Sequence, residues 1–251
     1  MIELINDIKL NFTKSGDKGK DVILLHGWGQ NRIMMEAIEN FLSLHFVVYN
    51  LDLPGFGESD EPKRAYSVED YSEFLRAFII KEGIEEPILI GHSFGCRIAL
   101  HYAFKYPVNR MVLTGAAGIR DKRGLKWYLK TYSYKLGKKV LSLPIFKKQL
   151  AAMQDKVGSE DYRNASGIKR ETLVKVVNDD VTPFLKDIKT ETLLVFGTND
   201  EATPLAKGEM MEKLMPNATL VVFEGDDHYA YFHQAQRFNM VLEAFLKDEY
   251  N

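Results

Sequence analysis

The stretch Pro87-Ile88-Leu89-Ile90-Gly91-His92-Ser93-Phe94-Gly95 places a serine between two glycines, directly after an apolar run. The segment Ser93–Tyr106 has the apolar spacing of a helix and stops before Pro107. A very tight strand-to-helix turn holds its serine in strained backbone geometry, so the positions two before and two after it must lack colliding side chains. Gly91 and Gly95 meet that need, and we predict a strand, a sharp turn that presents the Ser93 hydroxyl, and a helix.

Short apolar runs alternate with amphipathic segments on both sides of this turn. The expected strands are Ile2–Ile5, Ile8–Phe12, Val22–Leu25, Phe46–Tyr49, Pro87–Ile90, Arg110–Thr114, Leu193–Phe196 and Thr219–Phe223. The expected helices are Ile33–Leu44, a segment from the N-cap Ser67 to Gly83, Ser93–Tyr106, Pro204–Leu214 and His233–Leu246. This alternation predicts an α/β fold: a doubly wound, mostly parallel sheet with helices on both faces. Such sheets carry their reactive groups on loops beyond the carboxyl ends of the strands.

The alternation of strand-like and helix-like segments stops between about Gly115 and Pro183 and then resumes. We therefore expect a core built from residues 1–116 and 184–251, with a helical insertion at residues 117–183 that enters late in the sheet.

Composition excludes several classes of protein. The chain has 251 residues, 33 of them basic and 35 acidic, and 45% are apolar. A sizeable core can therefore form without disulfide or metal cross-links. A lone Cys96 cannot form an internal disulfide, a cysteine-based zinc site or a redox pair. The N-terminus carries Glu3 and Asp7 and has no secretory pattern, and no apolar run is long enough for a transmembrane segment. We expect a cytoplasmic protein that uses no metal and no cofactor.

A serine hydroxyl becomes a strong nucleophile only when a base removes its proton, and that base is most often histidine. His228 lies in Gly225-Asp226-Asp227-His228, directly after the expected strand Thr219–Phe223. It therefore lies on a strand-end loop, as Ser93 does. We predict His228 as the base, with His233 as the alternative.

The base in turn needs a carboxylate to orient its ring. Asp200 ends the loop Phe196-Gly197-Thr198-Asn199-Asp200, again just past a strand, and Glu201 beside it is the competitor. Asp226 and Asp227 are too near His228 in sequence to reach the far side of its ring easily. We predict Asp200, which gives the chain order Ser93, Asp200, His228.

Acyl chemistry on a serine also needs two hydrogen-bond donors aimed at the developing oxyanion. One should be the backbone N–H of Phe94, the residue after the nucleophile. The other should come from the loop His26-Gly27-Trp28-Gly29, which follows the expected strand Val22–Leu25. We assign it to the backbone N–H of Trp28, with Gly27 and Gly29 allowing the tight turn.

Five motifs together resemble the α/β-hydrolase superfamily over nearly the whole chain. They are, in family order, HGWG at 26–29, DLPGFGES at 52–59, GHSFG at 91–95, GTND at 197–200 and GDDH at 225–228. The resemblance implies that the insertion is a cap over the site and that Asp52 is structural. A serine nucleophile argues against the dehalogenase and epoxide hydrolase branches, which use aspartate at that position.

We expect a serine hydrolase that cleaves a carboxylic ester or thioester, carboxylesterase-like, through an acyl-enzyme on Ser93. Two alternatives stay open. The same triad serves carbon–carbon bond hydrolases, carrier-protein methyl esterases and perhydrolases, and it could also persist in a ligand receptor or interaction protein with negligible turnover.

The predicted cap holds an uneven charge distribution. Residues 119–150 contain ten basic side chains and one acidic one, a local charge of +9 that leaves −11 for the rest of a chain whose net charge is −2. Apolar residues three or four apart alternate with the lysines, which indicates a basic amphipathic helix. Such a helix either covers the site or docks an anionic partner, an acyl carrier protein or an anionic lipid surface. No nucleic-acid motif accompanies it, so we expect no nucleic-acid partner.

Overall fold

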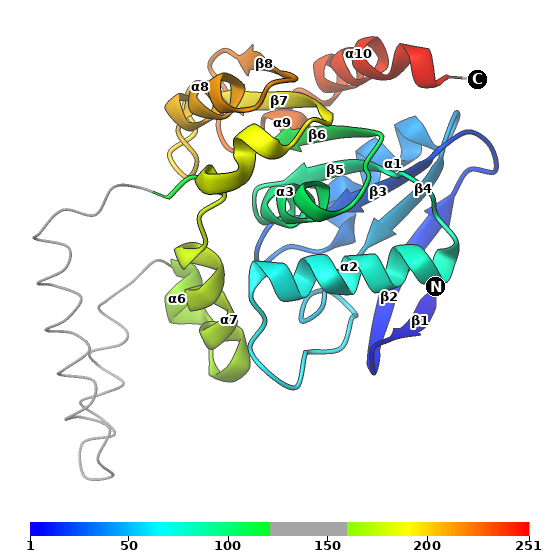
Figure 1. The fold of residues 1–251 in the computed structure, drawn as a ribbon, viewed down its shortest axis with the longest axis vertical. Helices are drawn as coiled ribbons and strands as arrows, with labels where there is room; N and C mark the ends of the chain where they lie inside the picture. Colours follow the sequence, from blue (N-terminus) through cyan, green and yellow to red (C-terminus); the bar gives the residue numbers. More distant parts are fainter. Residues whose placement is uncertain (121–159, 251) are drawn as a thin grey trace, which may run out of the picture.

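The computed structural model describes residues 1–120 and 160–250, with eight strands in one sheet (Figure 1). The order across the sheet is β1-β2-β4-β3-β5-β6-β7-β8, with β1 and β2 antiparallel to their neighbours and all other pairs parallel. The strands are β1 (Ile2–Ile5), β2 (Ile8–Ser15), β3 (Asp21–Leu25), β4 (Val47–Leu51), β5 (Ile88–His92), β6 (Arg110–Thr114), β7 (Glu191–Gly197) and β8 (Ala218–Phe223). The predicted α/β architecture is confirmed.

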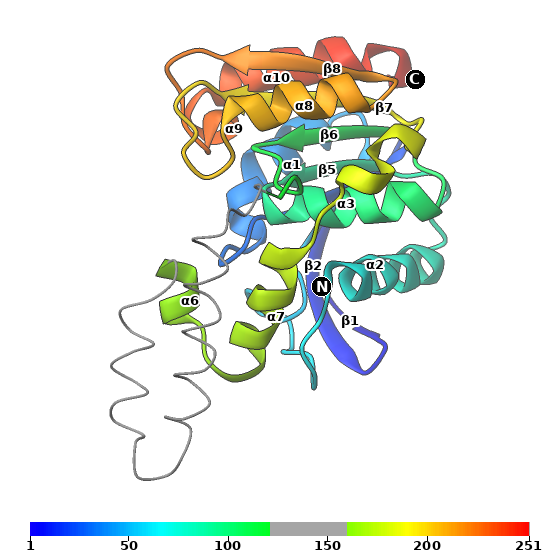
Figure 2. The same cartoon turned by 60° about the vertical axis from the view of Figure 1, so that its left-hand side comes forward.

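Alternating side chains bury both faces of the sheet. In β3, Ile23 and Leu25 belong to one apolar cluster, while Val22 and Leu24 belong to the other. The first cluster is covered by α2 (Val68–Glu82), α3 (Phe94–Lys105) and α8 (Leu205–Leu214), and the second by α1 (Glu36–Leu42), α9 (Ala230–His233) and α10 (Ala235–Leu246) (Figures 1 and 2). The core is therefore two apolar layers, one on each side of the sheet.

Strand register brings the loops with the sequence motifs to one edge. Leu25, at the end of β3, pairs with Leu51 of β4 and with Gly91 of β5. His92, at the end of β5, pairs with Thr114 of β6. Because these parallel strands end level with one another, the loops that follow them lie side by side.

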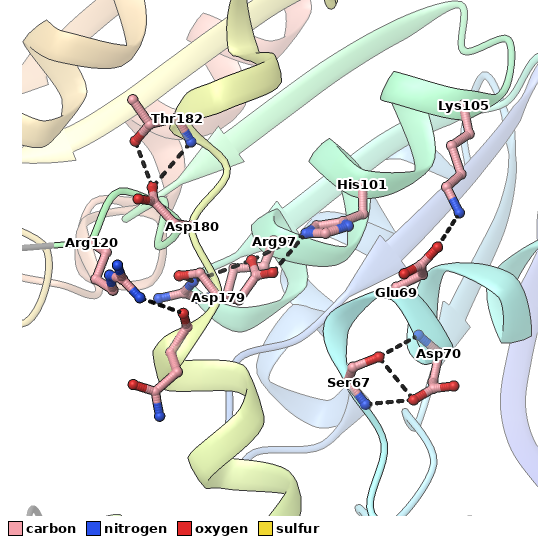
Figure 3. A network of polar contacts seen from close by, with 11 residues as sticks. Ser67, Glu69, Asp70, Arg97, His101, Lys105, Arg120, Asp179, Asp180 and Thr182 are labelled. Carbon is pink, nitrogen blue, oxygen red and sulfur yellow. Dashed lines mark hydrogen bonds and ion pairs between the residues drawn. The ribbon is translucent and has the colours of Figure 1, made fainter.

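The start of α2 confirms its sequence signal. The Ser67 hydroxyl accepts a hydrogen bond from the backbone N–H of Asp70, and the Asp70 carboxylate accepts one from the N–H of Ser67 (Figure 3). The helix ends at Gly83, whose φ of 69° is readily adopted by glycine.

Two expected helices differ from the structure. The segment expected as Ile33–Leu44 begins as a 3-10 turn, η1 (Arg32–Met35), and only then becomes α1. The last long helix begins at Ala235 instead of His233, because Gln234 leaves helical geometry and donates its side-chain amide to Asp226. Apolar spacing does not report this tertiary bond.

The connection between β6 and β7, residues 115–190, contains α6 (Glu160–Asn164), α7 (Gly167–Asn178) and the 3-10 helix η3 (Thr182–Asp187), and no strand among its described residues. Helix α7 packs on the loop between β4 and α2: Thr172 accepts from the backbone N–H of Tyr66 at 3.1 Å, and Lys175 donates to the carbonyl of Ala65 at 2.7 Å. The predicted boundaries 117–183 remain a prediction. The basic segment lies outside the described residues, apart from Ile119 and Arg120.

The end of α7 is tied to α3, the helix that follows the sharp turn (Figure 3). The Asp179 carboxylate lies 3.0 Å from Nε2 of His101 and 3.6 Å from a guanidinium nitrogen of Arg97, which also donates to the Asp179 carbonyl. Arg120 donates to the carbonyl of Asn178 at 3.2 Å. Both ends of the connection are therefore held together beside α3.

Within the described ranges, no helix is both long and apolar enough to cross a membrane.

Candidate active site

Ser93 occupies the sharp turn that its sequence predicts. It lies between the end of β5 and the start of α3. Its φ is 50°, a backbone conformation that residues other than glycine rarely adopt. A Cβ atom on Gly91 would lie 2.8 Å from the backbone nitrogen of Cys96, and one on Gly95 would overlap the carbonyl of Leu25. Both glycines are needed because backbone, not a movable side chain, fills the space.

Asp200 and His228 meet as predicted. Oδ2 of Asp200 lies 2.7 Å from Nδ1 of His228, and the side chain of Asp200 has no exposed surface. Glu201 is exposed and does not take part in this contact. The two partners are 28 positions apart, and the chain between them contains α8 and β8, which return it to the same sheet edge.

A third residue, Thr203, completes this pair. Its hydroxyl donates to Oδ2 of Asp200 at 2.7 Å, and its backbone N–H donates to Oδ1 at 2.7 Å. Burial alone would raise the pKa of Asp200, but the hydrogen bonds from His228 and Thr203 outweigh it and lower that pKa. Asp200 is therefore held as an anion. Its Oδ1 accepts from backbone N–H groups of the turn, and its Oδ2 is shared between the Thr203 hydroxyl and His228. The only sequence signal for Thr203 is its place three residues after Asp200.

The imidazole of His228 lies next to the serine turn. A Cβ atom on Gly115 would lie 2.9 Å from Nδ1 of His228, and the preceding residue, Thr114, accepts a hydrogen bond from the backbone N–H of Ser93 at 3.0 Å. In the part of the chain that the structure describes, no hydrogen bond joins the Ser93 hydroxyl to His228. Ser93 and His228 therefore share one small region of the sheet edge, where Asp200 is the hydrogen-bond partner of the His228 ring.

The two predicted oxyanion donors come from neighbouring loops. The rings of Trp28 and Phe94 contact each other edge to face, 5.5 Å between centroids, and Phe56 packs against both. Neither the Trp28 nor the Phe94 backbone N–H has a hydrogen-bond acceptor among the described residues, and Phe94 is the first residue of α3, where N–H groups have no partner in the helix. Within the described residues, both N–H groups can therefore donate to a further acceptor.

The sequence model of the family described as "alpha/beta hydrolase fold" matches residues 21–235. This chain belongs to the alpha/beta hydrolase fold family. The matched span runs from β3 to the start of α10 and so includes every residue of the candidate site described above.

Named relatives of this alpha/beta hydrolase include more than one kind of enzyme. A 2-hydroxy-6-oxo-6-phenylhexa-2,4-dienoate hydrolase of Burkholderia cepacia is 28% identical over 269 residues, with 96% of this chain and 92% of that protein covered. An esterase from Exiguobacterium antarcticum superposes with a TM-score of 0.77 at 22% identity, covering 98% of each chain. A meta-cleavage product hydrolase from Pseudomonas fluorescens IP01 superposes with a TM-score of 0.74 at 22% identity, covering 99% of this chain and 97% of that one.

Two further histidines of this alpha/beta hydrolase are structural. His26 is fully buried between the carbonyl of Gly27, 2.7 Å from Nδ1, and the N–H of Leu53, 3.0 Å from Nε2, which requires its proton on Nδ1. His92 is buried against the ring of His228, 4.7 Å between centroids, with Nδ1 near the carbonyl of Thr114. Burial lowers the pKa of His26 to about 4 and that of His92 to about 3, so both stay neutral beside the site.

The alternative base His233 has a different partner. Its Nδ1 lies 2.9 Å from Oδ1 of Asp226, which raises its pKa, and almost half of its side chain is exposed. Asp226, Asp227 and His233 bring three ligand-type atoms within 4.8 Å of one another, but Asp226 already accepts bonds from His233 and Gln234. We assign no metal to this cluster, and it is separate from the Asp200–His228 pair.

Proposed function

We propose that this protein is a serine hydrolase that cleaves a carboxylic ester or thioester through an acyl-enzyme on Ser93. The observation that carries the proposal is the joint placement of a serine at φ 50° and a histidine that is 2.7 Å from a buried carboxylate. His228, held by Asp200, lies beside that serine turn at one sheet edge. Strained serine geometry and an oriented base are what nucleophilic catalysis needs.

In the first half-reaction, Oγ of Ser93 attacks the scissile carbonyl carbon while Nε2 of His228 takes its proton. The carbonyl π electrons move to the oxygen, and the backbone N–H groups of Trp28 and Phe94 stabilise the resulting oxyanion. Collapse of this intermediate breaks the bond to the leaving group, which receives the proton from His228. Asp200 stabilises the imidazolium that forms in between.

In the second half-reaction, water attacks the acyl-enzyme and gives its proton to Nε2 of His228. Collapse of the second intermediate releases the acid and returns the proton to Oγ of Ser93. His92 and His26 are not the base, because burial lowers the pKa of each and so disfavours the imidazolium that a base forms when it takes a proton.

A second candidate is hydrolysis of a carbon–carbon bond in a dienoate. The named dienoate hydrolase of Burkholderia cepacia favours it, since the similarity covers 96% of this chain. The serine, histidine and aspartate described above would serve either substrate. A ligand receptor that keeps these residues with negligible turnover is the third possibility.

Turnover of p-nitrophenyl butyrate by the purified protein, with Ser93→Ala beside it, tests the proposal. We expect measurable turnover that the substitution lowers by at least about 10³-fold. Wild-type turnover in Ser93→Ala would exclude Ser93 as the nucleophile. Cleavage of a 2-hydroxy-6-oxo-dienoate with no ester turnover would favour the second candidate, and turnover of neither compound would favour the receptor.

A further inference from the structure

Lys169 of α7 has no counter-charge in the described part of the chain. It is half-buried, its ammonium donates one hydrogen bond to the carbonyl of Gly55 at 3.1 Å, and the same nitrogen lies 4.4 Å above the ring of Phe56. Within residues 1–120 and 160–250, no carboxylate lies within ion-pair distance of it. Glu61 lines the same small depression but is exposed and makes no ion pair with it. An ammonium has three N–H donors, so two remain for another acceptor.

This cation lies one aromatic ring from the candidate site. The ring that it covers, Phe56, contacts Trp28 at 5.0 Å and Phe94 at 6.2 Å between centroids. Trp28 and Phe94 are the residues whose backbone N–H groups the proposed function uses. Phe56 therefore connects Lys169 to the two residues whose N–H groups would hold the substrate carbonyl.

Lys175 on the same helix provides a comparison. It also donates to a carbonyl of the loop between β4 and α2, that of Ala65, at 2.7 Å. Among the described residues no aromatic ring lies against the Lys175 ammonium, and the two lysines are six positions apart on α7. The two cations thus share a helix and a type of contact, and only Lys169 lies next to Phe56.

We propose that Lys169 binds an anionic group of the substrate, a carboxylate remote from the bond that is cleaved. The preferred substrates are then half-esters and related esters that carry a free carboxylate. An oriented ammonium beside an apolar ring favours an anion because the charge-assisted hydrogen bond forms where water is partly excluded. This inference rests on the proposed function, since it assigns the substrate class of that same site.

Two matched ester pairs test it. Mono-p-nitrophenyl adipate against p-nitrophenyl hexanoate places the carboxylate on the acyl side, and 4-acetoxybenzoate against phenyl acetate places it on the alcohol side. The measured quantity is the ratio of kcat/KM for the charged ester to that for the neutral ester, in which general losses of folding or catalysis cancel. The variants are Lys169→Met, Lys169→Arg and the control Lys175→Met.

We expect the wild-type protein to prefer the charged ester in one of the pairs, and Lys169→Met to lower that ratio by about tenfold, mainly through KM. Lys169→Arg should restore most of the ratio, Lys175→Met should leave it unchanged, and the wild-type ratio should fall as salt screens the charge. A ratio that is the same in Lys169→Met as in wild type, for both pairs, overturns the inference. If the wild-type protein turns over none of the four esters, the proposed function fails instead.

Discussion

Replacing Thr203 by valine removes one hydrogen bond from the Asp200 carboxylate and leaves the size of the side chain nearly unchanged. The lost bond is the one from the hydroxyl to Oδ2, 2.7 Å long, on the same oxygen that faces Nδ1 of His228. Asp200 keeps the backbone N–H groups of Ala202 and Thr203 on its other oxygen. The carboxylate therefore stays in its turn. Its Oδ2 loses one of its two side-chain partners and keeps only His228.

The expected loss follows from those contacts. A hydrogen bond to a charged group contributes about 1.5–3 kcal/mol, and three of the four donors to Asp200 remain. We expect kcat to fall about tenfold, which corresponds to about 1.4 kcal/mol of transition-state stabilisation. KM should change little, because Thr203 is buried and acts on the base through Asp200 and through its own 3.2 Å contact with Nδ1 of His228.

Steady-state hydrolysis of p-nitrophenyl butyrate measures this effect. Thr203→Ser keeps a hydroxyl and should retain most of the activity. Thr182→Val is the matched control, because Thr182 bonds Asp180 through the same hydroxyl and backbone pattern away from the site. The reasoning is refuted if Thr203→Val has the wild-type kcat, or if Thr182→Val loses as much.

Two other predictions concern the turn and the buried histidines. Gly95→Ala places a methyl against the backbone of Leu25, so α3 must shift; we expect about 100-fold lower ester turnover and about 1–3 kcal/mol lower stability, and near-wild-type activity would contradict the turn geometry. The pKa values of His26 and His92, lowered by burial from 6.5 to about 4 and about 3, mean that only the unfolded chain binds protons there in mild acid. The free energy of unfolding should therefore fall by about 3 kcal/mol between about pH 6.5 and about pH 5, measured by urea unfolding. His92→Leu should roughly halve this dependence, and an unchanged dependence would show that burial does not hold His92 neutral.

Much of the site can be predicted from the sequence because its residues follow strands. Ser93, Asp200 and His228 each lie just past the end of a strand, and parallel strands deliver such positions to one sheet edge. The need for glycine on both sides of Ser93 could be predicted because the turn leaves no room for side chains there. Local constraint and sheet topology together account for these placements.

Individual side-chain contacts could not be predicted in this way. Thr203 reaches Asp200 inside a turn whose path no periodicity describes, and Lys169 meets Phe56 across more than a hundred positions of the chain. The sequence also carries no signal that the rings of His26 and His92 are buried and that burial lowers their pKa values. Gln234 interrupts the last helix for a similar reason, because its partner, Asp226, comes from a preceding loop.

The account depends most on a covalent intermediate at Ser93, and rapid-quench mass spectrometry during turnover of p-nitrophenyl butyrate measures it directly. We predict a protein fraction heavier by one butyryl group, with the added mass on the peptide that contains Ser93 and absent from Ser93→Ala. His228→Ala should form this species far more slowly than wild type. Turnover in which the acyl group is found on another residue would contradict the assignment of Ser93.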